Sequence, residues 1–146
     1  MQDIDEISGD VVDLALRIHR DLGPGLFESI YETVLAGKLT AMGYKVDRQK
    51  PIDIEFEGQV FPAAFRLDLL VDDRLIVEIK CTEGLSKAHL KQLHTYLRLT
   101  GQPVGLLINF AGATLKEGLR RVVNDHVPSA TPRLRVNQCL NGVTDV

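Results

Sequence analysis

The sequence predicts one α/β domain in which helices flank a small mixed β-sheet, and three observations support this fold class. Near the N-terminus, apolar residues recur at spacings of three and four, which is typical of amphipathic helices. In the middle of the chain, two short segments alternate apolar and polar residues, as half-buried strands do. A further predicted helix leads to the continuous apolar run of residues 104–110, which suits a strand covered on both faces. The expected order is helices, three strands, a helix and a strand (α-βββ-α-β), an α/β sandwich.

The first two elements are predicted to be helices. Apolar residues follow helical spacing from residue 7 to residue 22, and Ser8 is a candidate N-cap. Glycine and proline at residues 23–25 then break the pattern. A second helix with a broad apolar face is expected from about residue 26 to residue 42, where a glycine follows.

Two neighbouring segments are predicted to be the strands of a hairpin, and each places charge on one face. In residues 65–71 the alternation leaves Asp68 on the face opposite the apolar side chains. In residues 75–81 it leaves Glu78 and Lys80 on the corresponding face. The apolar face of the first segment is expected to consist of Phe65, Leu67, Leu69 and Val71.

The hairpin register follows if both apolar sets share one core. Val71 then pairs with Leu75 across a three-residue loop, and Asp68 lies opposite Glu78 with Lys80 beside them. Like charges placed opposite each other destabilise a sheet unless a cation lies between them. This arrangement suits a hard divalent metal ion with a lysine next to it. Exposed strand faces also produce the pattern by chance, so alone it marks a functional site in about one case in ten.

The remaining elements complete the domain. Residues 45–56 are expected to form a strand, and a helix capped by a serine is expected over residues 86–100. Residues 114–123 are amphipathic and fit either a helix or a strand. We therefore predict an α/β domain over residues 1–123. Residues 124–146 are predicted to be a C-terminal tail, either loosely structured or packed as an extension.

Composition narrows the class of protein. The 146 residues carry a net charge of −3, with 45% hydrophobic and 25% charged residues, which is ordinary for a globular domain. No apolar run approaches the roughly 20 residues that a membrane span needs. The N-terminus is acidic, unlike a signal peptide, and two cysteines are too few for a disulfide framework. We expect a reduced, cytoplasmic protein. Its basic clusters are small, so charge neither supports nor excludes a nucleic-acid partner.

Several polar residues border the predicted apolar faces. Glu28 falls at the edge of the apolar face of the second helix, next to Tyr31. His89, Gln92 and Tyr96 follow one another at spacings of three and four beside the buried stripe of the later helix. Such residues often satisfy only local hydrogen bonds, but they also suit the mouth of a site that holds water or phosphate. No zinc-type ligand spacing and no nucleophile motif is present.

Four segments of the chain resemble the sequence blocks of the GxxExxY protein family, a branch of the PD-(D/E)XK nuclease superfamily. The segments are LGPGLFESIYE (22–32), RLDLLVDDRLIVEIK (66–80), HLKQLHTYLRLTG (89–101) and VGLLINF (104–110). They stand in the order of the family and cover roughly residues 7–123. Gly25, Glu28 and Tyr31 match the three residues of the GxxExxY motif after which the family is named. The resemblance implies a core like that of restriction endonucleases.

The resemblance also implies a metal site. Asp68 and Glu78 match the metal-binding positions, and Lys80 matches the catalytic lysine. The backbone carbonyl of Ile79 and the carboxylate of Glu28 are possible further ligands for one or two Mg²⁺ or Mn²⁺ ions.

Residues of the flanking helices complete the implied site. Gln92 matches the glutamine of the helix that follows the metal site, and it is expected to act in catalysis with the charged set. Tyr31, His89 and Tyr96 are expected to position the substrate. The departures, Phe65 in place of tyrosine and Cys81 in place of a small residue, leave the charged set intact.

The implied function is that of a metal-dependent phosphodiesterase or nuclease, a hydrolase acting on nucleic acid, with DNA favoured over RNA. An alternative is a nuclease-fold protein that binds or regulates without cleaving. A third possibility is a catalytic domain that takes its specificity from a protein partner or from its own dimer.

Overall fold

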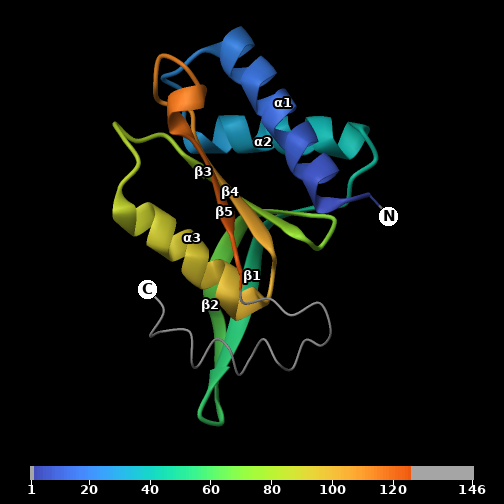
Figure 1. Ribbon diagram of the computed structural model, residues 1–146, viewed down its shortest axis with the longest axis vertical. Helices are drawn as coiled ribbons and strands as arrows, with labels where there is room; N and C mark the ends of the chain where they lie inside the picture. Colours follow the sequence, from blue (N-terminus) through green and yellow to red (C-terminus); the bar gives the residue numbers. More distant parts are fainter. Residues whose placement is uncertain (1, 126–146) are drawn as a thin grey trace.

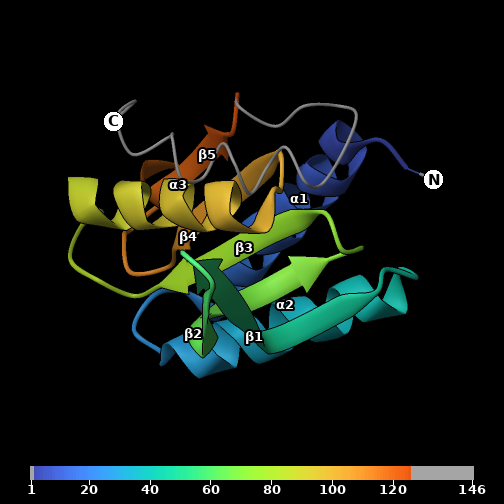
Figure 2. The ribbon, with the colours of Figure 1, turned by 90° about the horizontal axis from the view of Figure 1, so that it is seen from below.

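The structure, a computed structural model, describes residues 2–125, and the predicted tail lies almost entirely outside them. Two helices cover one face of a five-stranded sheet and one helix covers the other (Figures 1 and 2). The elements are α1 (Ile4–Leu22), α2 (Glu28–Ala41), β1 (Val46–Phe56), β2 (Gln59–Val71), β3 (Leu75–Lys80), α3 (Lys87–Thr100), β4 (Val104–Asn109), the 3-10 helix η1 (Lys116–Gly118) and β5 (Leu119–Val123). No helix in this part of the chain is both long enough and apolar enough to cross a bilayer.

The sheet is mixed and its strands lie in chain order, β1-β2-β3-β4-β5. All neighbours pair antiparallel except β3 and β4, which are parallel and are joined by α3 as a crossover helix. The predicted α-βββ-α-β order is confirmed. The structure also decides between the two alternatives for residues 114–123, since a short 3-10 turn leads into the edge strand β5.

The core has two parts, one on each face of the sheet. β4 is buried along its whole length, because Leu106 and Ile108 point toward α1 and α2 while Leu107 points toward α3. This confirms the prediction of a strand covered on both faces. The part beneath α3 consists of Leu67, Leu70, Ile76, Leu93, Leu97 and Leu107.

The helix boundaries differ from the predicted ones at the N-terminus. α1 begins at Ile4, with Asp3 as the N-cap residue, so the prediction that Ser8 caps this helix was wrong. Ser8 is buried within the helix, and its hydroxyl donates a hydrogen bond to the carbonyl of Asp5 at 3.2 Å. The acidic residues of the first turn suit the positive end of the helix dipole, which explains the earlier start.

The register of the β2–β3 hairpin is the predicted one, with Val71 opposite Leu75. The predicted single apolar face along β2 was wrong. Leu69 and Val71 pack toward α1 and α2, whereas Leu67 packs beneath α3 on the other side of the sheet. The regular alternation of β2 therefore breaks at Asp68, between these two groups of residues.

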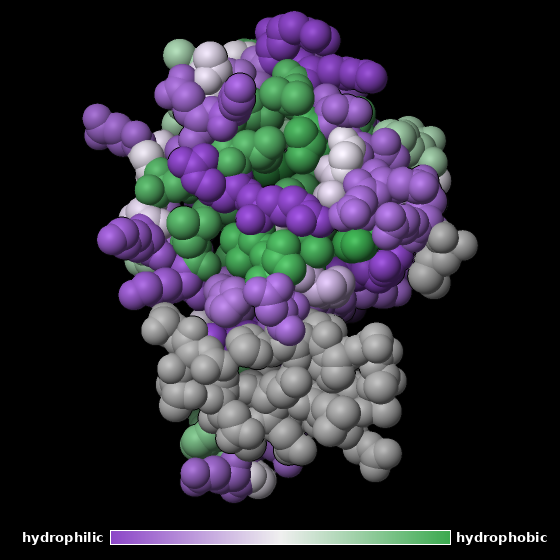
Figure 3. Space-filling model, in the orientation of Figure 1, coloured by the Kyte–Doolittle hydropathy of each residue, from purple (hydrophilic) through white to green (hydrophobic). Residues whose placement is uncertain are grey.

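The β1–β2 hairpin extends beyond the helices, at the bottom of Figure 1. Figure 3 shows apolar surface on the face of the molecule seen in Figure 1, interrupted by a polar band. β5 lies on this face, and two hollows of about 580 and 380 Å³ beside it share Arg121. Neither hollow is lined by Asp68 or Glu78, so the charged face of the β2–β3 hairpin lies elsewhere.

Candidate functional site

The two carboxylates of the hairpin meet where the backbone ladder between β2 and β3 ends. The last paired residues are Leu69 and Val77. One residue further, the backbone N–H of Asp68 donates to Glu78 Oε2 at 2.8 Å, and that of Ile79 donates to Asp68 Oδ2 at 2.8 Å. Side-chain oxygens thus take the place of strand carbonyls, and the two strands separate around the carboxylates. The predicted juxtaposition of Asp68 and Glu78 is present.

Glu78 is buried in this opening, with 5% of its surface exposed. Burial first, and then the negative charge of Asp68, raise the pKa of Glu78 to about 8, while the hydrogen bond from the backbone N–H of Asp68 and the charge of Lys80 partly oppose the shift. The opening therefore holds two ionised carboxylates only at a cost in free energy. A bound cation would remove that cost.

A backbone oxygen completes the set of possible ligands. The carbonyl of Lys80 accepts a hydrogen bond from Phe110 N at 2.9 Å and so points toward β4. Because successive carbonyls alternate in direction along a strand, that of Ile79 points toward β2, into the opening. Within residues 2–125, no three His, Cys, Asp or Glu side chains are grouped to hold a metal. A metal here would need Asp68, Glu78, the Ile79 carbonyl and water, an all-oxygen set that fits Mg²⁺ or Mn²⁺.

Glu28 reaches the same edge of the sheet from the N-terminus of α2. Its Oε2 accepts a hydrogen bond from the backbone N–H of Cys81 at 3.1 Å, one residue beyond Lys80. The pKa of the Cys81 thiol is raised by burial and then by the charge of Glu28. Glu28 is exposed, so it lies at the rim of the opening.

Tyr96 approaches the carboxylates from α3. Its ring stacks on Phe65 of β2, with centroids 4.2 Å apart and planes 6° apart. Its pKa is raised by burial and then by the charges of Glu78 and Asp68, which places its hydroxyl within their field. Tyr96 therefore lies on the face of the sheet that α3 covers, beside Phe65 of β2.

On α3, Gln92 lies about one turn before Tyr96, and His89 lies about two turns before it. Ser86 and His89 form a capping box, in which His89 N donates to Ser86 Oγ at 3.2 Å and Ser86 N donates to His89 Nδ1 at 3.1 Å. This confirms Ser86 as the N-cap. Because Nδ1 accepts a hydrogen bond, the neutral ring carries its proton on Nε2, which remains available as a donor. Gln92 is exposed.

Tyr31 lies apart from this group. It is fully buried, and its ring stacks on Phe110 at 4.3 Å. Its hydroxyl donates to the carbonyl of Gly23 at 2.6 Å and accepts from Leu26 N at 3.2 Å. A side chain without exposed surface does not contact a substrate in this conformation. The hydrogen bonds of Tyr31 join the two ends of the turn between α1 and α2, and its substrate-positioning role stays a prediction.

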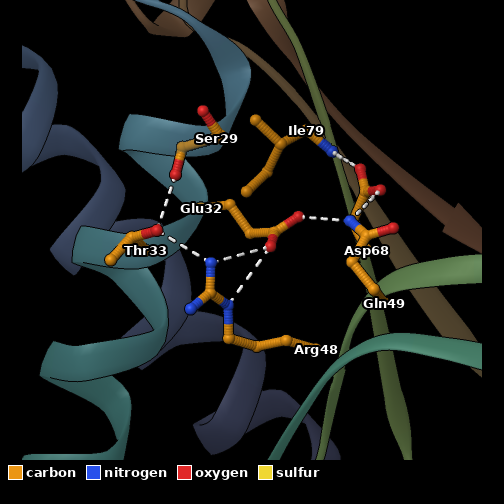
Figure 4. A network of polar contacts seen from close by, with 7 residues as sticks. All are labelled: Ser29, Glu32, Thr33, Arg48, Gln49, Asp68 and Ile79. Carbon is orange, nitrogen blue, oxygen red and sulfur yellow. Dashed lines mark hydrogen bonds and ion pairs between the residues drawn. The ribbon is translucent and has the colours of Figure 1, made fainter.

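Three residues beside the carboxylates were missing from the sequence prediction. Glu32 of α2 is buried, with 6% of its surface exposed, and it is bound by Arg48 and Gln49 of β1 (Figure 4). Gln49 also donates to Asp68 Oδ1 at 3.2 Å. One signal was available, since Glu32 follows Glu28 by four residues and so shares its face of the helix. No motif or spacing near Arg48 or Gln49 in the sequence indicated that they lie beside Asp68 and Glu32.

Comparisons with known proteins identify the family of the chain. The family model of the PD-(D/E)XK nuclease superfamily matches residues 5–122. No curated protein matches the chain. Among solved structures, the crystal structure titled "Crystal structure of SSO0001" is similar, with 18% identity, a TM-score of 0.44, and coverage of 92% of this chain and 74% of that chain. The family match spans both strands of the hairpin, the crossover helix and the parallel strand that follows it. On this match, the chain belongs to the PD-(D/E)XK nuclease superfamily.

Proposed function

We propose that this protein is a metal-dependent nuclease that hydrolyses phosphodiester bonds, with DNA as the preferred polymer. The observation that carries the proposal is the meeting of Asp68 and Glu78 where the β2–β3 ladder ends. Each carboxylate there holds a backbone N–H of the opposite strand, and Glu78 is buried with a raised pKa. Membership of the nuclease superfamily supports this function.

The metal site would consist of Asp68, Glu78 and the carbonyl of Ile79, with Glu28 as a further ligand directly or through water. One or two Mg²⁺ or Mn²⁺ ions would lower the pKa of a bound water and offset charge on the scissile phosphate. Lys80 follows the ligands on β3, and its ammonium would orient the attacking water or stabilise the charge of the transition state.

α3 supplies the other side of the site. His89 would donate a hydrogen bond from Nε2 to a phosphate oxygen, and Gln92 would position water or phosphate. Tyr96, held by its stacking on Phe65, would form the wall next to the carboxylates.

The first test is calorimetric titration of Mn²⁺ and Mg²⁺ into the wild type and the Asp68→Ala/Glu78→Ala double variant. Both proteins are then assayed on single- and double-stranded DNA and on RNA. A Glu6→Ala/Asp13→Ala variant, which removes two exposed carboxylates of α1, is the matched control. We expect metal binding and cleavage in the wild type and the control, and neither in the double variant at the hairpin.

Two results would contradict the proposal. Metal binding by the wild type without cleavage of any polymer would favour a module that binds nucleic acid without cutting it. Equal metal binding by the wild type and the hairpin double variant would show that the site lies elsewhere.

A further inference from the structure

The side chain of Gln49 links a buried acid of α2 to the carboxylate of Asp68. Its Nε2 donates to Glu32 Oε1 at 2.6 Å and to Asp68 Oδ1 at 3.2 Å. An amide nitrogen has two hydrogens, so both bonds form at once. The other oxygen of Asp68 is held by Ile79 N at 2.8 Å. Both oxygens of this carboxylate are therefore fixed, one from β1 and one from β3.

Glu32 is itself held from the other side. Arg48 donates to Glu32 Oε2 from Nε at 3.2 Å and from Nη2 at 3.1 Å. Nη2 also donates to Thr33 Oγ1 at 2.7 Å, and Thr33 in turn donates to the carbonyl of Ser29 at 2.7 Å. Figure 4 shows this continuous path from α2 through β1 to Asp68. The positive charge of Arg48 balances the negative charge of the buried Glu32 carboxylate, whose other oxygen accepts the hydrogen bond from Gln49.

The backbone of Gln49 is adapted to this contact. β1 pairs Arg48 with Leu69 and Lys50 with Leu67, so Gln49 faces Asp68, and these two are joined through their side chains. Gln49 has φ of +49°, a left-handed conformation that residues other than glycine seldom adopt within a strand. A backbone conformation of this kind is strained and persists only where neighbouring contacts stabilise it. Strained residues of this kind are common at functional sites.

We propose that Gln49 is a positioning residue that orients Asp68 for metal binding, with Glu32 and Arg48 as its support. The inference rests on the proposed function, because it assigns Asp68 as a ligand. Hydrogen-bonded partners of metal ligands fix the orientation of those ligands, and their loss typically weakens metal affinity 10–100-fold. A tie between α2 and β1 with no role at the site is the competing explanation.

The test uses Gln49→Met, which keeps the length of the side chain and removes both donors. Gln102→Met is the matched control, since Gln102 donates a hydrogen bond at 2.9 Å to the carbonyl of Asp73 in the hairpin loop. We expect Gln49→Met to weaken Mn²⁺ binding about 10-fold in calorimetry. Cleavage should lose kcat with little change in KM for the nucleic acid. The Gln102→Met control should match the wild type in both respects.

A second measurement needs no metal. The amide of Ile79 donates to Asp68, so its hydrogen exchange reports the orientation of that carboxylate. We expect faster exchange at Ile79 in Gln49→Met, with the amide of Val77 unchanged. Arg48→Met, which alters a half-exposed side chain, should shift both measurements in the same direction by less.

The outcomes separate the two proposals. Wild-type Mn²⁺ affinity and wild-type exchange at Ile79 in Gln49→Met, with a lowered melting temperature, would show a structural tie and overturn the inference. If the wild type itself binds no Mn²⁺, the proposed function fails. In that case exchange at Ile79 still decides whether Gln49 orients Asp68.

Discussion

At the scale of single residues, Glu78 has a strongly raised pKa because of its surroundings. Glu78 is buried, and a second carboxylate, that of Asp68, lies beside it. The backbone N–H of Asp68 donates a hydrogen bond to Glu78. With its pKa raised to about 8, most Glu78 carboxyls are protonated at pH 7 when no cation is bound. Metal binding there would displace a proton, so Mn²⁺ affinity should increase with pH up to about 8.

The first prediction concerns the pH dependence of stability. The pKa of Glu78 is about 8 in the folded chain, against 4.5 ordinarily, so the folded chain holds this proton more tightly than the unfolded chain between those pH values. The protonated Glu78 therefore contributes its full stabilisation below about pH 4.5. As the pH rises to about 8, this contribution is lost, and the free energy of unfolding falls by roughly 3–5 kcal/mol. Glu78→Gln should remove this loss. Urea unfolding from pH 5 to 9 in the presence of EDTA measures it.

The control for this prediction is Glu6→Gln, which changes an exposed carboxylate of the first turn of α1. It should keep the pH dependence of the wild type. If Glu78→Gln loses as much stability toward pH 9 as the wild type does, Glu78 is not the responsible group.

The second prediction separates the structural role of Tyr31 from contact with substrate. Tyr31→Phe removes the hydroxyl that bridges Gly23 and Leu26, and it should lower the free energy of unfolding by about 1–2 kcal/mol. Mn²⁺ affinity and cleavage should stay at wild-type values, as measured by calorimetry and nuclease assay. Unchanged stability with weakened substrate binding would restore the role expected from the sequence.

At the scale of elements, the site depends on how the end of β3 is held beside β4. Asn109, buried at the end of β4, accepts a hydrogen bond from Thr82 N at 3.1 Å and donates to the Thr82 carbonyl at 2.9 Å. These bonds fix the chain just after Lys80. Gly118, at the end of η1, packs against the backbone of Asn109, so that a Cβ there would overlap the Asn109 carbonyl oxygen.

The third prediction follows from this close approach. Gly118→Ala should destabilise the fold by about 1–3 kcal/mol, because the atom in the way is backbone and cannot rotate aside. Gly9→Ala on α1 is the matched control: a Cβ there has no neighbour within 4 Å. In that helix the change should stabilise by about 0.5–1 kcal/mol. Urea denaturation compares the two, and equal effects would contradict the packing argument.

At the scale of the whole molecule, the carboxylates of Asp68 and Glu78 lie on inner strands of the sheet. β2 and β3 are inner strands, and both parts of the core pack on them, one beneath α3 and one beneath α1 and α2. A ligand that holds these strands together at their open end should therefore stabilise the entire fold.

The fourth prediction is that Mn²⁺ raises the melting temperature in a single transition. At 100 times its dissociation constant, a ligand specific for the folded state adds about 2.7 kcal/mol. EDTA should reverse the shift, and the Asp68→Ala/Glu78→Ala variant should show none. Differential scanning calorimetry provides the measurement. Separate transitions, with only one of them sensitive to Mn²⁺, would show that the two parts of the core unfold independently.

The sequence by itself determined the local framework of the site. The period of two in the hairpin strands was enough to place Val71 opposite Leu75 and hence Asp68 opposite Glu78. The serine before α3 marked its start correctly. These features follow from side-chain direction along a strand and from capping at a helix end, which depend on residues close together in sequence.

Only the tertiary structure decided what surrounds the carboxylates. Gln49 and Glu32 come from β1 and α2, far from Asp68 in sequence, and polar residues of their kind occur on many exposed surfaces. The break in alternation at Asp68, the burial of Glu78 and the enclosure of Tyr31 likewise depend on which elements pack over them. Burial and long-range hydrogen bonds are set by packing between distant segments, and no local spacing in the chain specifies them.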